Sequence, residues 1–209
     1  MTASTAETYR VPTLADYPDL TPEEMGRRFL KLIDSLKSID DLALVNVQQI
    51  MQMNLISWPD GKGAGLNMHL PESDWHYGIS YFNGSGIARN QSIAYSLFKQ
   101  SKNQNPRDLI DMSPVCAMDY NDYVMELKRI GFVEREEFAQ YDTPQPPIIA
   151  DTETGKTIRD TPRSWRLPVY FFTRPGLLVQ IHERREANEP DPKRRHACVE
   201  RISVRRYDQ

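Results

Sequence analysis

The sequence predicts an α+β fold in which N-terminal helices pack on an antiparallel sheet, made of a hairpin plus a C-terminal three-stranded meander. Apolar residues recur at helical spacing near the N-terminus and again around residues 120–130. Between residues 75 and 97, and again after residue 166, they alternate with polar ones as in strands. The 209 residues, 39% of them apolar, suffice for one substantial core or for two small lobes that share it.

The first helix is expected to begin after Thr21, which can cap it, with Pro22 in its first position and Glu24 closing a capping box. Its apolar stripe consists of Met25, Phe29, Leu32, Ile33 and Leu36. A second helix is predicted from about residue 40 or 41 to 54. A third is predicted over 120–130 and ends at Gly131, a residue suited to a left-handed stop.

Two strands, around residues 75–82 and 93–97, are predicted to form a hairpin across the loop 83–86. Three more strands are predicted over 167–173, 177–184 and 197–206. Residues 1–20 are expected to be a flexible arm, and 21–209 a single α+β domain with a long loop at about 142–164. The Trp58–Gly65 segment concentrates glycine after a Trp-Pro step and is interpreted as a loop.

No apolar run reaches the length of a membrane span, and the N-terminus shows no secretory signal, so we expect a cytoplasmic protein without a membrane partner. In that compartment Cys116 and Cys198 are expected to be buried thiols. A disulfide between them is the alternative, although a cytoplasmic location does not favour it.

The chain carries its charge unevenly. Residues 159–209 hold 12 basic against 7 acidic side chains, whereas residues 1–158 hold 14 against 22. Arginines and aromatic residues near the C-terminus could contact nucleic acid. The net charge of −3 argues against that partner, because nucleic-acid-binding domains usually carry a basic excess.

No combination of residues predicts catalysis or a cofactor. His69 and His76 bracket Glu72 and Asp74, which could converge on an ion. None of the spacings matches the helical His-His or paired Cys patterns of zinc sites, so we predict no metal site.

The Trp58–Gly65 loop is the strongest candidate for recognition, because tryptophan often anchors interfaces. The sequence leaves open the alternative that Trp58 seals the core. With the acidic residues near it, the predicted partner-binding residues are Trp58, Asp60, Glu72 and Asp74.

The capped helix 21–37, the helix followed by a Gly-Phe step at 127–132, and the closing meander with Cys198 resemble small cytoplasmic immunity proteins of bacterial antagonism. That class includes immunity proteins against toxins delivered by type VI secretion. The resemblance implies a non-catalytic protein that binds a cognate toxin and occludes its active site. A nucleic-acid-binding accessory protein that uses the basic C-terminal strands and a small enzyme of unrecognised type are the alternatives.

Overall fold

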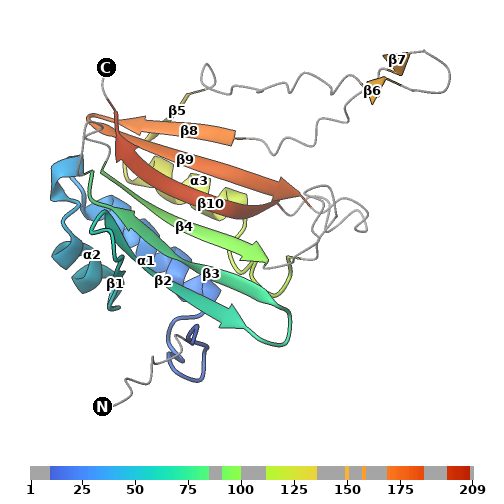
Figure 1. Ribbon diagram of the computed structural model, residues 1–209. Coiled ribbons are helices and arrows are strands. Elements are labelled where there is room, and N and C mark those ends of the chain that lie inside the picture. The colour runs from blue at the N-terminus through green and yellow to red at the C-terminus, as the bar shows by residue number, and fades with distance from the viewer. Residues whose placement is uncertain are drawn as a thin grey trace, which may run out of the picture.

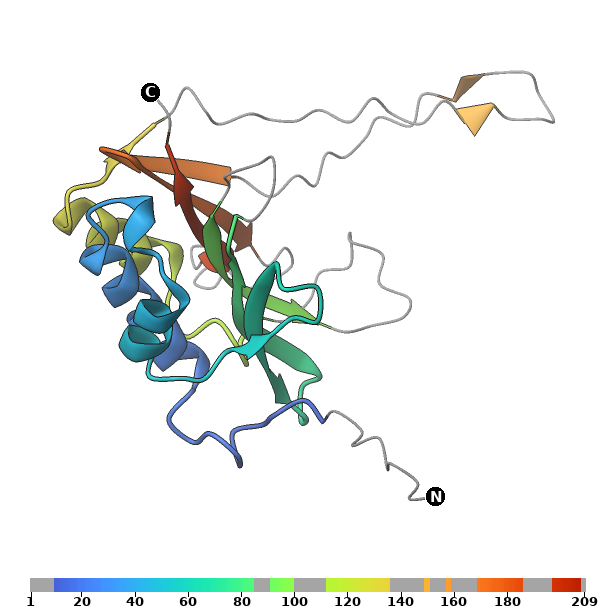
Figure 2. The ribbon, with the colours of Figure 1, turned by 60° about the vertical axis from the view of Figure 1, so that its left-hand side comes forward.

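The computed structural model describes residues 10–84, 91–99, 112–135, 149–150, 157–158, 169–185 and 197–207. Helices and an antiparallel sheet confirm the α+β class (Figure 1). The helical elements are α1 (Pro22–Ser35), the 3-10 helix η1 (Ile39–Asp41), α2 (Leu44–Met51) and α3 (Tyr120–Arg129). Figure 2 shows these helices on one side of the sheet.

One sheet has the strand order β1-β2-β3-β4-β10-β9-β8-β5, and all neighbouring strands in it are antiparallel. Its strands are β1 (Ile56–Ser57), β2 (Gly63–Leu70), β3 (Trp75–Phe82), β4 (Ser92–Lys99), β5 (Val133–Glu134), β8 (Val169–Arg174), β9 (Leu177–Arg185) and β10 (Ala197–Arg206). The predicted hairpin is β3–β4, and the predicted meander is β8–β9–β10. Because β10 pairs with β4, both belong to one continuous sheet.

The sequence did not predict β2. Its first three residues, Gly63, Ala64 and Gly65, lie in the segment that was interpreted as a loop. Glycine is depleted in strands, so its density there masked the alternation of Ala64, Leu66 and Met68 that follows. The segment nevertheless forms a strand because eight of its residues pair with β3. The backbone hydrogen bonds of this pairing compensate for the low strand propensity of glycine.

Helix α1 begins and packs as the sequence predicted. The Thr21 hydroxyl accepts a hydrogen bond from the Glu24 amide at 3.2 Å, and Met25, Phe29, Leu32 and Ile33 are buried. The Glu24 carboxylate, however, does not close the capping box as expected. It accepts a hydrogen bond from Arg28 at 2.7 Å instead, an i,i+4 pair along the helix surface.

The predicted second helix is two elements. Asp41 closes a capping box with Ser38, so the chain forms the short η1, and α2 starts only at Leu44. Helix α2 ends before Gln52, whose backbone is in the left-handed conformation with φ of +52°. Helix α3 agrees closely with its prediction, and Gly131 at φ of +90° ends it as expected.

The core lies between the helices and one face of the sheet. From that face the hydroxyls of Tyr77 and Tyr95 donate hydrogen bonds to the carbonyls of Leu20 (2.6 Å) and Pro22 (2.9 Å), at the start of α1. Arg174 on β8 donates to the carbonyls of Ile33 (3.2 Å) and Ile130 (2.9 Å), at the ends of α1 and α3. Polar contacts therefore hold both ends of the helical layer to the sheet.

The described part of the predicted N-terminal arm packs against the sheet. The His69 amide donates to the Pro12 carbonyl at 2.8 Å, Thr13 forms a parallel bridge with His69, and Leu20 is buried. Residues 10–20 therefore cover part of the outer edge of β2, which differs from the expected flexible arm. Within the predicted loop 142–164, β6 (Ile149–Ala150) pairs with β7 (Thr157–Ile158), and the other residues of that loop lie outside the described part.

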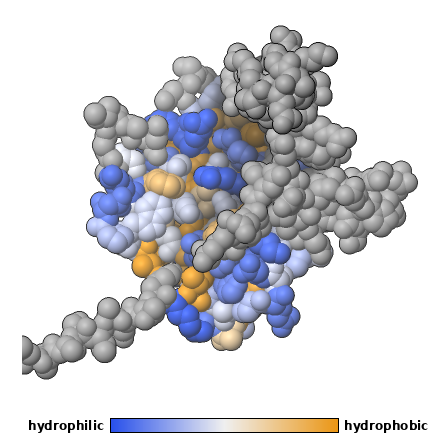
Figure 3. Space-filling view, turned by 45° about the vertical axis from the view of Figure 1, so that its right-hand side comes forward, coloured by the Kyte–Doolittle hydropathy of each residue, from blue (hydrophilic) through white to orange (hydrophobic). Residues whose placement is uncertain are grey.

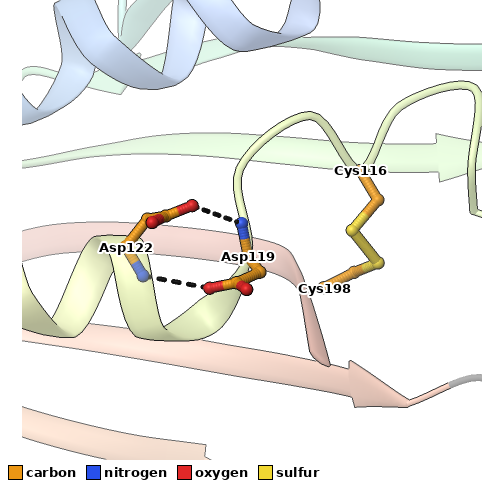
Figure 4. Close-up of a disulfide and its surroundings, with 4 residues drawn as sticks. All are labelled: Cys116, Asp119, Asp122 and Cys198. Carbon is orange, nitrogen blue, oxygen red and sulfur yellow. Dashed lines mark hydrogen bonds between the residues drawn. A yellow bond between two sulfur atoms is a disulfide. The ribbon is translucent and has the colours of Figure 1, made fainter. Parts of the chain in front are cut away.

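The two cysteines form a disulfide, which corrects the expectation of buried thiols (Figure 4). Cys116 precedes α3, and Cys198 lies near the start of β10, 82 residues later. Beside them Asp119 caps α3 in a reciprocal pair with Asp122, at 3.0 and 3.1 Å, and forms a β-bridge with Cys198. The disulfide therefore joins the start of α3 to the sheet.

Disulfides are typical of oxidising compartments. The disulfide therefore argues against the predicted cytoplasmic location, which stays a prediction. No helix in the described ranges is long and apolar enough to cross a membrane.

We expect reduction of the disulfide, or the substitution Cys198→Ser, to lower the free energy of unfolding by about 4 to 5 kcal/mol. The reason is that the bond closes a long loop in the unfolded chain. Urea unfolding with and without dithiothreitol measures the loss. A variant with both cysteines replaced by serine should not respond to the reductant. Two thiols that react with Ellman's reagent in the native, unreduced protein would contradict the bond.

Candidate functional site at the two ends of the β2–β3 hairpin

The face of the sheet opposite the helices carries the candidate site. Strand register places residues in rows across this face, and one row runs from Gly65 through Ser80, Ala94 and Ser203 to Gln180. Figure 3 looks onto this side, where hydrophobic and hydrophilic residues are intermixed. Ala94 and Gly78, in the middle, are buried. Two exposed aromatic side chains of the described strands, Phe82 and Phe98, lie instead near the two ends of the β2–β3 hairpin.

At one end Ile56, Trp58 and Phe82 form a group that we call the Trp58 cluster. The rings of Trp58 and Phe82 meet edge to face, with centroids 4.8 Å apart. Ile56 is 48% exposed and Phe82 41%, while Trp58 is half-buried. Trp58 therefore lies on the outer side of the sheet rather than in the core, which decides the alternative that the sequence left open.

Trp58 packs on bare backbone. A Cβ atom added at Gly63 would come within 2.7 Å of the Trp58 ring and 2.1 Å of the Tyr81 carbonyl oxygen. One added at Gly65 would lie 3.4 Å from Trp58 Nε1. The glycines that obscured β2 in the sequence are thus what lets the indole lie flat on this strand.

Hydrogen bonds hold the loop that carries Trp58. Its amide donates to the Gly63 carbonyl at 2.9 Å, and its carbonyl accepts from the Gly61 amide at 3.0 Å. The Asn83 side chain donates to the Gly61 carbonyl at 2.6 Å, which ties the loop to the end of β3. The aromatic group is therefore preorganised and needs little ordering on binding.

At the other end of the hairpin, His69, Asp74 and His76 form a group that we call the histidine cluster. His69 and His76 are direct cross-strand neighbours, and their rings stack with centroids 4.4 Å apart. Because the His69 amide bonds outward to Pro12, this is a non-hydrogen-bonded pair, the type in which side chains are closest. The Asp74 carboxylate lies 3.6 Å from His69 Nε2.

The two histidines differ in their surroundings. His76 is 5% exposed and lies between His69 and Phe98, whose ring stacks on it at 5.3 Å. Burial, and secondarily the nearby His69, lower the pKa of His76 below its ordinary value. Its imidazole is therefore neutral at pH 7. His69 is more exposed, yet its Nε2 atom is buried and has no hydrogen-bond partner.

The structure divides the four predicted partner-binding residues. Trp58 and Asp60 lie at the Gly63 end of β2, and Glu72 and Asp74 in the turn beyond Leu70. Strand β2 has eight residues. The seven steps between its first and last residue span roughly 23 Å at the rise of a β-strand. They therefore do not form the single patch that the sequence suggested. Asp60 is exposed and lies 3.8 Å from Lys62, while Glu72 is exposed in the turn.

Ile56, Phe82 and Phe98 were not predicted from the sequence as site residues. Alternation along β3 and β4 puts Phe82 and Phe98 opposite the buried Tyr81 and Leu97, a signal that was present but not used. The nearness of His69 to His76 depends on the β2–β3 register, and therefore on a strand that was not predicted.

Two of the C-terminal arginines also belong to this face. Arg201 and Arg205 are exposed on β10, level with Ser96 and Ser92 of β4. His182 is the β9 partner of Arg201, and burial, then the charge of Arg201, lower its pKa. The side chains of Arg184 and Arg185, and residues 193–195, lie outside the described part.

A separate groove of about 490 Å³ lies between α1 and α3 on the helical side. Charges of both signs line it, and its Arg129 pairs with Glu126 at 2.6 Å. Its Arg27 pairs with Glu23 at 2.7 Å. These charges are balanced among neighbours, so the groove favours neither an anionic nor a cationic ligand.

Comparisons of the chain with models of protein families, with curated proteins and with solved structures gave no match.

We expect Gly63→Ala to lower the free energy of unfolding by about 1 to 3 kcal/mol, because the new methyl group overlaps both the Tyr81 carbonyl and the indole. The same change should displace Trp58, which is measurable as a shift in the Trp58 contribution to fluorescence, obtained by difference from Trp58→Phe. Lys62→Ala, at the exposed neighbouring position, is the control and should change stability by less than about 0.5 kcal/mol. Equal stability of the two variants would contradict the packing described here.

Proposed function

We propose that this protein acts by binding another protein through the Trp58 cluster. The observation that carries the proposal is a half-buried tryptophan, held by hydrogen bonds, beside exposed Phe82 and Ile56. Aromatic side chains that are positioned before binding are typical centres of protein interfaces, because they bury much area at little entropic cost.

The specific role that we propose is that of an immunity protein, which occludes the active site of a cognate bacterial toxin and acts in the cytoplasm without catalysis or cofactor. The rigid loop and aromatic anchors support a blocking role, and the acidic balance of residues 1–158 would attract a toxin with a basic cleft. Asp60 and Glu72 lie at opposite ends of the hairpin. Their carboxylates would therefore attract the toxin as part of the overall electrostatic field of the protein, and not as one local patch. The disulfide argues against the cytoplasmic part of this proposal.

The partner to test first is the protein encoded by the adjacent open reading frame, since immunity proteins act on toxins encoded beside them. We expect Trp58→Ala and Phe82→Ala each to weaken that complex by about 30-fold, the loss that corresponds to about 2 kcal/mol at an interface centre. Biolayer interferometry with purified proteins measures it. In cells that produce the toxin, both variants should protect less well than the parent protein.

Val45→Ala is the matched control, because Val45 is an equally apolar side chain, 67% exposed, on α2. It should leave the affinity unchanged. A complex that forms with equal affinity in Trp58→Ala and in the parent protein would remove the Trp58 cluster from the interface. Absence of any complex and of any protection would reject the immunity role.

The second candidate is nucleic-acid binding, and the observation that favours it is the pair of exposed arginines on β10, on the same face as exposed Phe82 and Phe98. We rank it lower because the chain has a net charge of −3, while affinity for nucleic acid comes mainly from phosphate neutralisation.

The protein-binding proposal therefore predicts that fluorescence anisotropy of a labelled single-stranded oligonucleotide at 0.15 M salt shows no saturable binding. Binding that decreases steeply with salt, and that is lost in the variant Arg201→Gln/Arg205→Gln but not in Trp58→Ala, would instead support the second candidate.

A further inference from the structure

We propose that the histidine cluster binds one divalent transition-metal ion of the zinc type. His69, Asp74 and His76 each offer a ligand atom, and these atoms all lie within 4.8 Å of one another. Two imidazoles and one carboxylate form a donor set that suits Zn²⁺ and its first-row neighbours. Glu72, in the same turn, is not part of this group.

The first supporting observation is the state of His69. Its Nε2 atom is buried without a hydrogen-bond partner, although buried polar atoms are nearly always satisfied. The Asp74 carboxylate lies 3.6 Å from this atom, beyond hydrogen-bond range. A cation between these two groups would satisfy both at once.

The second observation is the rigidity of the surroundings. Pairing with β2 on one side and β4 on the other holds the strand of His76, and Phe98 stacks on its ring. The strand of His69 is bound on its outer side by the Pro12 carbonyl. Two ligands on paired strands thus start from a fixed separation, which lowers the cost of assembling the site.

Binding requires a small rearrangement. Metal–nitrogen bonds of about 2.0 to 2.1 Å in tetrahedral geometry place ligand atoms about 3.3 Å apart, so the group must contract by about 1.5 Å. The stacked rings are nearly parallel, at 13°, and their lone pairs do not converge. The more exposed His69 ring is the one with room to turn, together with the exposed Asp74 side chain.

Three protein ligands leave at least one coordination position for water or for a group from a partner. The site would lie at the end of the hairpin remote from the Trp58 cluster, so it is independent of the proposed protein interface. Metal ions bind imidazole only in its unprotonated form, so metal affinity should fall as the pH is lowered.

The test is a titration of the purified, untagged, unreduced protein with Zn²⁺ at pH 7.5, in competition with a chromophoric chelator. The disulfide removes both cysteines as competing ligands. We expect one saturable site per chain. Even ligand-supporting residues outside the coordination sphere typically contribute about 10- to 100-fold to affinity. Loss of a direct ligand in His69→Gln or Asp74→Asn should therefore weaken binding by at least about 100-fold.

His182→Gln and His196→Gln are the matched controls, because they remove the other two histidines of the chain. Both should retain the parent affinity. Asn is well tolerated at the left-handed position of Asp74, where φ is +58°, so Asp74→Asn should fold even if a histidine variant does not.

Absorption of the Co²⁺-loaded parent protein between 500 and 650 nm provides a second measurement that needs no variant. A four-coordinate site without sulfur ligands should produce d–d bands there. Absence of a saturable Zn²⁺ site in the parent protein would overturn the proposal. Equal affinities of the parent and Asp74→Asn, or loss of binding only in His182→Gln or His196→Gln, would also overturn it.

Discussion

Burial of one face of the eight-stranded sheet under the helices is the constraint on which the rest of this structure depends. Side chains alternate across a strand, so a register that directs Leu66, Tyr77 and Ile202 into the core also directs their neighbours outward. A shift of one residue would exchange the two faces. The hydroxyls of Tyr77 and Tyr95 and the guanidinium of Arg174 add directional contacts to this packing, at the two ends of the helical layer.

The outward face is therefore a consequence of the core, and it places two different kinds of chemistry at the ends of one hairpin. At the Gly63 end, glycine leaves space for an indole, and the result is an apolar surface suited to contact with protein. At the Leu70 end, two imidazoles and a carboxylate meet beside an exposed phenyl ring. Roughly 23 Å of strand separates the ends, so each can act without the other.

Local patterns predicted the elements whose stability is local. Thr21 and Pro22 mark the start of α1, Gly131 marks the end of α3, and alternation identifies β3, β4, β9 and β10. The pattern did not reveal β2, because glycine has a low strand propensity. The glycines of β2 instead leave room for the Trp58 ring to pack against the backbone. The second helix was predicted too long because the Ser38–Asp41 capping box starts a separate short helix. Of the Trp58 cluster, only Trp58 was identified in advance. His69 and His76 were considered as possible ion ligands, but their spacing matches no known zinc pattern, so a metal site was not predicted.

Sequence patterns suffice to predict the α+β class, the position of most helices and strands, and the distribution of charge, since these depend on composition and on residues close together in the chain. Long-range packing, in contrast, brings Cys116 to Cys198, stacks His69 on His76, and places Trp58 far from Glu72. Each of these depends on which strands pair and in which register. Pairing is selected by the burial of the whole sheet against the helices, and no short stretch of residues encodes it.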